Sequence, residues 1–105
     1  MNSKFAFTYG RVDVRAKLSA GNGTWPAIWM LVKNINENGG CWDNSFCTVN
    51  WPACGEIDIM EHGIYAINEI GAALHTTCCN SGNPNKGTVF ASDVANNFHI
   101  YSVNW

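Results

Sequence analysis

The feature that most constrains this chain is a strict alternation of charged and apolar residues near its N-terminus. In residues 11–18, RVDVRAKL, every second residue is apolar and the residues between them are charged. Side chains alternate between the two faces of a β-strand, so a period of two predicts a strand with one buried face and one exposed face. We expect this strand to occupy residues 5–18. No segment of the sequence shows the sustained period and caps of a helix, and there is no internal repeat.

Four further segments have the composition of strands, and turns rich in Gly and Asn separate them. Trp25–Leu31 is short and nearly all apolar, which predicts a strand buried on both faces. The other three segments are Gly55–His62, Ile67–Thr77 and Phe98–Trp105. Turn residues occupy 19–24 and 80–87. This succession of short strands predicts an all-β fold, a β-sandwich or jelly roll.

The composition of the 105 residues fits a globular chain, with 47% hydrophobic and only 13% charged residues. A net charge of -2 gives no electrostatic case for binding nucleic acid or an anionic membrane. No apolar run approaches the ~20 residues that a membrane span needs. We therefore expect neither partner. Because residues 103–105 still have a strand pattern, we also expect residues 1–105 to be an incomplete domain, cut at both ends.

The cysteines leave several arrangements open. None of the five has the C-x2-C spacing of a structural zinc site. Three lie in or beside a long loop rich in Gly and Asn, Asn34–Pro52, where disulfides would suit an oxidising compartment. Alternatively, several are simply small buried residues. The odd count leaves at least one thiol unpaired within the chain, and the connectivity of Cys41, Cys47, Cys54, Cys78 and Cys79 stays open.

Three carboxylates lie close together in the segment GEIDIMEH, at Glu56, Asp58 and Glu61. In a regular strand Glu56 and Asp58 share a face, whereas Glu61, five positions after Glu56, points the other way. A β-bulge at Ile59–Met60 would absorb one residue and return Glu61 to the first face. Like charges gathered on one face destabilise a strand, so such a cluster indicates a function.

Retaining glycosidases need such a cluster, because they use two carboxyl groups ~5–5.5 Å apart, one as nucleophile and one as acid/base. Glu56 and Glu61 would form this pair. Asp58 between them could raise a neighbour's pKa through like charge and hold the nucleophile by sharing a proton. Two alternatives remain open from the residues alone. Clustered carboxylates also suit a calcium ion, and a solvated polar face needs no function at all.

The same segment resembles the active-site signature of glycoside hydrolase family 16, E-x-D-x-(x)-E. The signature here contains the optional extra residue, which we place at Met60. In this it resembles the laminarinase branch of the family, the endo-β-1,3-glucanases. Three more stretches fit the family in the right order. They are YGRVDVRAKL at residues 9–18, GTWPAIWML at 23–31 and FHIYSVNW at 98–105. The resemblance covers almost the whole chain and implies a concanavalin-like jelly roll with a concave glycan cleft.

The resemblance also implies roles for the site residues. Glu56 is expected to be the nucleophile, Asp58 its supporting acid and Glu61 the acid/base. Trp25 and Trp29 match cleft tryptophans that stack on sugar rings, although composition alone favours the core for tryptophans. His75 matches a histidine on a neighbouring strand near the acids and is the sixth expected site residue, in a substrate-binding role. The alternative is that His75 has only a structural role in its strand. For His62 and His99, as for Arg11 and Arg15, we expect structural or surface roles.

The function expected from the resemblance is hydrolysis of internal β-1,3 or mixed β-1,3/1,4 linkages in laminarin-type glucans. A non-catalytic glycan-binding module of the same fold is one alternative, and a hydrolase of agarose or carrageenan is another. No cofactor is expected for the chemistry, and no metal in the site, while a structural calcium ion is possible in the complete domain. We expect a monomer whose partner is a β-glucan. The N-terminus lacks the features of a signal peptide, so we expect the complete protein, rather than this chain, to carry one and to be secreted, periplasmic or on the cell surface.

Overall fold

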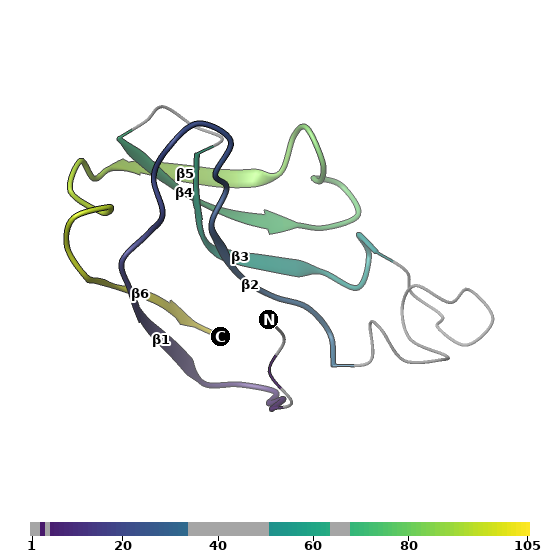
Figure 1. Ribbon diagram of the computed structural model, residues 1–105. Helices are drawn as coiled ribbons and strands as arrows, with labels where there is room; N and C mark the ends of the chain where they lie inside the picture. Colours follow the sequence, from purple (N-terminus) through teal and green to yellow (C-terminus); the bar gives the residue numbers. More distant parts are fainter. Residues whose placement is uncertain (1–2, 4, 34–50, 64–67) are drawn as a thin grey trace.

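The computed structural model describes residues 3, 5–33, 51–63 and 68–105. In these ranges the chain forms six strands and no helix, so the prediction of an all-β fold is confirmed. None of these ranges holds a helix that could cross a membrane. The strands are β1 (Arg11–Ala16), β2 (Ala27–Met30), β3 (Glu56–His62), β4 (Glu69–His75), β5 (Asn85–Phe90) and β6 (His99–Asn104). They form two antiparallel sheets, β1-β6 and β2-β3-β4-β5 (Figure 1).

The two-stranded sheet confirms the alternation predicted at both ends of the chain. Exposed and half-buried residues alternate along β1 and along β6. Two of the outward charges have partners. Arg11 forms an ion pair with Asp13 at 2.8 Å, and Arg15 lies 4.3 Å from the centre of the Phe98 ring in a cation–π contact. The predicted start of the strand is wrong. β1 begins at Arg11 rather than Phe5. Gly10 still exchanges two backbone hydrogen bonds with Trp105, whereas residues 5–9 pair with no strand.

The second predicted strand is shorter and more exposed than expected. β2 covers only Ala27–Met30, and its residues alternate between exposed and half-buried instead of being buried on both faces. The reason is its position, because β2 is an edge strand of the four-stranded sheet and packs on the core with one face. Ile28 faces that core, while Trp29 lies on the open face.

Strand β3 contains the predicted bulge. On the β4 side, Asp58 pairs with Ala73 and Glu61 with Gly71, so two residues of β3 face one residue of β4. On the β2 side, Asp58 pairs with Trp29 and Met60 with Ile28. The residue without a partner in that ladder is Ile59, which corrects our placement of the extra residue at Met60.

The sequence prediction missed one strand entirely. Ile67–Thr77 corresponds to β4, Glu69–His75, but the segment assigned to a turn at residues 80–87 runs into β5, Asn85–Phe90. Every residue of β5 is exposed, and the strand pairs with β4 alone at the edge of its sheet. Its backbone hydrogen bonds to β4, rather than an apolar pattern, hold it in place.

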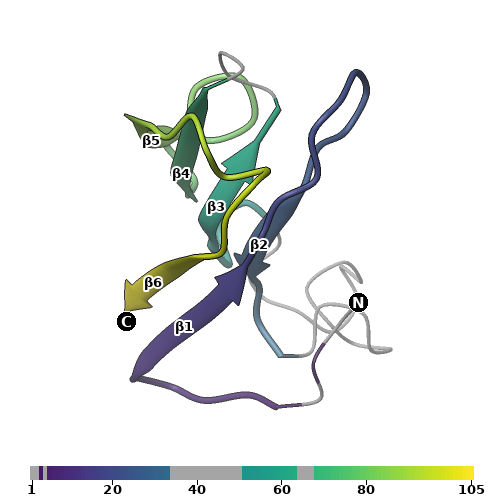
Figure 2. The same cartoon turned by 60° about the vertical axis from the view of Figure 1, so that its left-hand side comes forward.

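A small hydrophobic core lies between the two sheets, and Figure 2 shows β1 and β6 below the four-stranded sheet. Leu18, Met60, Ile70 and Val94 are buried there, and Met60 is only 1% exposed. A backbone hydrogen bond of 2.9 Å from Leu18 N to Val94 O ties the segment after β1 to the loop before β6. The core therefore packs directly behind the bulge of β3.

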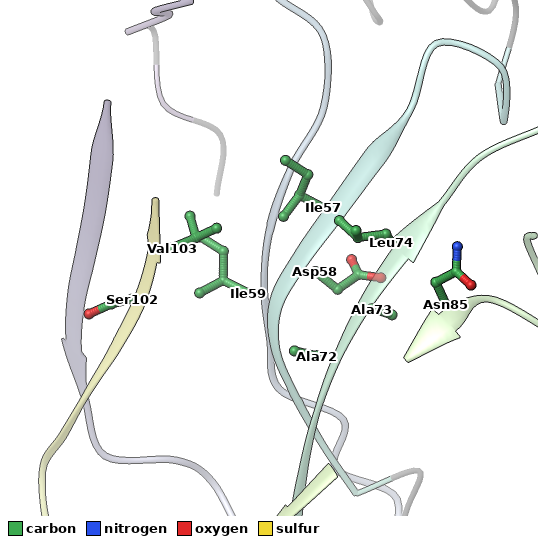
Figure 3. A pocket seen from close by; sticks show the side chains of 9 residues that line it. All are labelled: Ile57, Asp58, Ile59, Ala72, Ala73, Leu74, Asn85, Ser102 and Val103. Carbon is green, nitrogen blue, oxygen red and sulfur yellow. The ribbon is translucent and has the colours of Figure 1, made fainter. Parts of the chain in front are cut away.

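The face of β3 turned toward β6 lines a pocket of about 190 Å³ between the sheets. Figure 3 shows Ile59 beside Val103 of β6, while the carboxyl group of Asp58 lies on the other side of the β3 ribbon. The lining of this space is mixed, since the polar residues Asp58, Asn85 and Ser102 contribute to it besides the apolar side chains.

Met60 offers a test of the core behind the bulge. We expect Met60→Ala to lower the free energy of unfolding by about 2–5 kcal/mol, because it removes a fully buried side chain from a small core. Ile100→Ala, at a position 65% exposed, should change it by less than about 1 kcal/mol. Denaturant titrations of both variants measure the difference, and equal losses would contradict the assignment of the core.

Candidate active site

The acidic side chains gather on one face of the four-stranded sheet. Residues paired across an antiparallel ladder share a face, and Glu56 pairs with His75 just as Asp58 pairs with Ala73. After the bulge, Glu61 pairs with Gly71, which is on the same face of β4 because it lies two residues from Ala73. The bulge therefore places all three carboxylates on one face, as the sequence predicted.

The surroundings of Asp58 shift the pKa of its carboxyl group. The residue is 5% exposed, and burial, followed by the negative charges of Glu56 and Glu61, raises its pKa from 3.8 to about 6. A hydrogen bond to Glu56 favours the protonated form further, whereas His75 opposes the shift. The sequence predicted that Asp58 would raise the pKa of a neighbour. The raised pKa that the structure shows is that of Asp58 itself, because its carboxyl group is buried and lies between the charges of Glu56 and Glu61.

His75 lies against the acids, as predicted. Its Nε2 is 3.0 Å from Asp58 Oδ2, and both side chains are nearly buried. Its Nδ1 is buried and has no hydrogen-bond partner among the residues that the structure describes. The ring therefore supports Asp58 from the neighbouring strand. Whether it also contacts substrate stays a prediction.

Trp25 lies beside Glu61 because the backbone before β2 passes very close to the end of β3. Gly63 has a φ of 96°, and a Cβ added there would collide with the carbonyl oxygen of Thr24, so only glycine permits this approach. His62 N donates to Pro26 O at 3.1 Å and fixes the same crossing. As a result, Trp25 Nε1 donates a hydrogen bond of 3.2 Å to Glu61 Oε1.

Both predicted cleft tryptophans are open to solvent, with Trp25 62% and Trp29 49% exposed. Trp29 pairs with Asp58 in the β2–β3 ladder and so shares the face of the acids. Tryptophans that packed in the core would be covered. Their exposure next to the carboxylates leaves indole faces available for stacking on a sugar, so the core alternative is wrong for both residues.

The sequence prediction missed Trp51 as a member of this cluster. Its Nε1 donates a hydrogen bond of 2.7 Å to Glu56 Oε2, and its ring centre lies 5.9 Å from that of His75. The available signal was only its position five residues before Glu56, which by itself does not predict a contact.

The other candidate residues lie outside this cluster or are structural. His99 is on β6, with Nε2 3.0 Å from Asp93 Oδ1, and His62 is buried at the end of β3. Arg11 and Arg15 are exposed on β1, as expected. Within the described ranges, no group of three or more His, Cys, Asp or Glu side chains is arranged to hold a metal ion.

Three of the five cysteines lie in the described ranges. Cys54, Cys78 and Cys79 are free thiols, and none of them is fully buried, so the small-buried-residue alternative does not hold for these three. Cys41 and Cys47, and all of the Asn34–Pro52 loop except its last two residues, lie outside the described residues.

The raised pKa of Asp58 gives a testable pH dependence of stability. Above about pH 6 the folded protein must hold an ionised carboxylate in a buried, acidic site, whereas below pH 3.8 the group is protonated in both states. We expect Asp58→Asn to raise the free energy of unfolding at pH 7 by about 1–3 kcal/mol and to have little effect near pH 3.5.

The control is Asp13→Asn, since bonds from Ser102 and Arg11 lower the pKa of that exposed carboxyl group. That variant should lose stability at pH 7 rather than gain it. Urea titrations at both pH values measure the two effects. A destabilised Asp58→Asn protein at pH 7 would show that ionised Asp58 supports the fold.

This chain is similar to known proteins in sequence and in fold. A beta-glucanase of Rhodothermus marinus is 36% identical over 104 residues, which are 97% of this chain and 33% of that protein. A beta-1,3-glucan-binding protein of Penaeus monodon is 51% identical over 59 residues, or 56% of this chain and 13% of that protein. The crystal structure of a LamA variant from Z. galactanivorans, in complex with laminaritriose and laminaritetraose, is 44% identical with a TM-score of 0.77. The match includes 99% of this chain and 43% of the LamA chain.

The chain thus spans about a third or less of the length of the curated relatives it matches. Its two sheets are part of the jelly roll that the laminarinase structures share. The model of the glycosyl hydrolases family 16 matches residues 1–105, that is, every residue of the sequence. Together with the bulged acidic strand, this match over the entire chain shows that the protein belongs to glycosyl hydrolase family 16.

Proposed function

We propose that the protein is a retaining endo-glycosidase that hydrolyses internal β-1,3 or mixed β-1,3/1,4 linkages of laminarin-type glucans. The observation that carries the proposal is the bulge in β3, which aligns Glu56, Asp58 and Glu61 on one face of the sheet. A plain polar face would not need three carboxylates at the cost of a disrupted ladder. The beta-glucanase and the laminari-oligosaccharide complex among the relatives support the choice of glucan.

In the first step, Glu56 attacks the anomeric carbon while Glu61 gives its proton to the glycosidic oxygen. The bond from that carbon to the leaving oxygen breaks, and a glycosyl ester forms on Glu56. In the second step, Glu61 takes a proton from water, the water oxygen attacks the same carbon, and Glu56 leaves as a carboxylate.

The neighbouring side chains support these roles. The N–H of Trp25 bonds one oxygen of Glu61 and so orients the acid/base. Asp58, with its raised pKa, can share a proton with Glu56 and keep the two negative charges from repelling each other. The exposed faces of Trp25 and Trp29 would stack on sugar rings beside the scissile bond.

We further propose that the protein acts as a monomer on an extracellular or periplasmic β-glucan and needs no cofactor for the chemistry. A structural calcium ion would belong to parts of the complete domain beyond the acidic strand. We also propose that residues 1–105 are the central portion of the catalytic domain, in keeping with their coverage of the relatives.

A non-catalytic glucan-binding module is the second candidate, and the identity to the beta-1,3-glucan-binding protein favours it. Stacking on Trp25 and Trp29 would be enough for binding. Binding alone, however, does not require Glu56, Asp58 and Glu61 to be held together against their mutual repulsion. The intact acidic cluster is therefore the reason for placing catalysis first.

Replacing the nucleophile separates the two candidates. In the full-length protein we expect Glu56→Gln to lower reducing-sugar release from laminarin by at least roughly 10³-fold, because the covalent intermediate can no longer form. Binding of laminarin, measured by affinity electrophoresis, should persist. Asp13→Asn makes the same charge change on β1, away from the acids, and should keep full activity.

Unchanged hydrolysis by the Glu56→Gln protein would sink the assignment of the nucleophile. Binding of laminarin by the wild-type protein without any hydrolysis would establish the binding module instead. Parallel assays on agarose and carrageenan decide the substrate class, since hydrolysis of either one without hydrolysis of laminarin would contradict the proposed glucan.

A further inference from the structure

Trp51 completes a ring of four side chains, one of which is the proposed nucleophile Glu56. Its Nε1 donates to Glu56 Oε2 at 2.7 Å, and its ring lies beside His75 with 39° between the two planes. His75 in turn lies 3.0 Å from Asp58, and Asp58 shares a hydrogen bond with Glu56. One oxygen of Glu56 is thus held by an N–H donor from outside the acidic strand.

The local structure fixes this indole relative to β3. Residues 51–54 form a turn directly before the strand, in which Gly55 N donates to Pro52 O at 3.0 Å. Gly55 has a φ of 84°, a conformation that favours glycine, and it carries the chain from this turn into Glu56. The donor and its acceptor are therefore five residues apart on one short, hydrogen-bonded unit.

The chemistry of the second step gives this donor a specific task. When Glu56 is an ester through Oε1, Oε2 is a neutral carbonyl oxygen, and an N–H bond to it is weak. As water attacks and the bond from the anomeric carbon to Oε1 breaks, the electron pair returns to the carboxylate and negative charge develops on Oε2. A fixed donor aimed at that oxygen stabilises the transition state more than the ester.

In the first step the charge on Glu56 changes in the opposite direction. Glu56 starts as a full carboxylate and loses charge as it attacks, so the same donor stabilises the starting state more than the transition state. Its electrostatic effect therefore favours breakdown of the glycosyl ester over its formation. Its geometric effect, which is to hold Oε1 toward the substrate, helps both steps.

We propose that Trp51 is a positioning residue that holds Glu56 Oε2 and accelerates release of the sugar from the glycosyl-enzyme. The proposal rests on the proposed function, because it assumes that Glu56 is the nucleophile. It adds to that function a residue from outside the acidic strand and a defined step on which this residue acts.

The test replaces the donor and keeps the ring. In the full-length protein acting on laminari-oligosaccharides, we expect Trp51→Phe to lower kcat by roughly 10- to 100-fold. KM should fall as well, because the glycosyl ester accumulates, so that kcat/KM changes less than kcat. Mass spectrometry of the quenched reaction should show the covalent sugar adduct in the variant and much less of it in the wild-type protein.

Two matched variants keep the test decisive. Benzothienylalanine at position 51 retains the shape of the indole and lacks its N–H, so it must reproduce the adduct even if the Phe variant folds poorly. Trp105→Phe makes the same change at an exposed position after β6 and should leave both constants unchanged.

The outcomes separate the two levels of the argument. No hydrolysis by the wild-type protein would overturn the proposed function. An active wild-type protein with a Trp51→Phe variant of equal kcat would overturn only the inference about Trp51. Equal losses in kcat and kcat/KM without accumulation of the adduct would also overturn it, because Trp51 would then serve only to maintain the shape of the site.

Discussion

The site depends on one irregularity, the extra residue in β3. Without the bulge at Ile59, every residue after Asp58 would slip by one position in the ladder with β2, so that Met60 would no longer pair with Ile28 and Glu61 would face away from Glu56. With it, the strand keeps Met60 in the core and still turns Glu61 to the face of Glu56. The same bulge therefore satisfies packing on one side of the sheet and chemistry on the other.

Three supports converge on this strand from different parts of the chain. The crossing at Gly63 brings Trp25 to Glu61, His75 on β4 holds Asp58, and the turn before β3 brings Trp51 to Glu56. Each carboxylate thus has its own partner, supplied by a different element. The cost of gathering three acids appears at Asp58, whose raised pKa reflects burial between two like charges.

The sequence predicted the parts of the structure that are governed by local pattern. Alternation located β1 and β6, and the spacing of Glu56, Asp58 and Glu61 required a bulge. β5 was missed because residues 85–87, Asn-Lys-Gly, have turn composition and an exposed edge strand needs no apolar face. Trp51 was missed because its contact with Glu56 depends on the geometry of a turn. β2 is more exposed than predicted because it lies at the edge of its sheet, and the strand order that puts it there cannot be derived from composition.

The central claim, that the bulge makes Glu56 and Glu61 a retaining pair, is tested most directly by the stereochemistry of the product. Two carboxyl groups on one strand face at the retaining distance of ~5–5.5 Å lead to two displacements and net retention. Proton NMR of laminarin hydrolysis by the full-length protein should show the β-anomer of the new reducing end first, with the α-anomer appearing only by mutarotation. Initial release of the α-anomer would contradict the account, because it would require water, rather than Glu56, to attack the sugar.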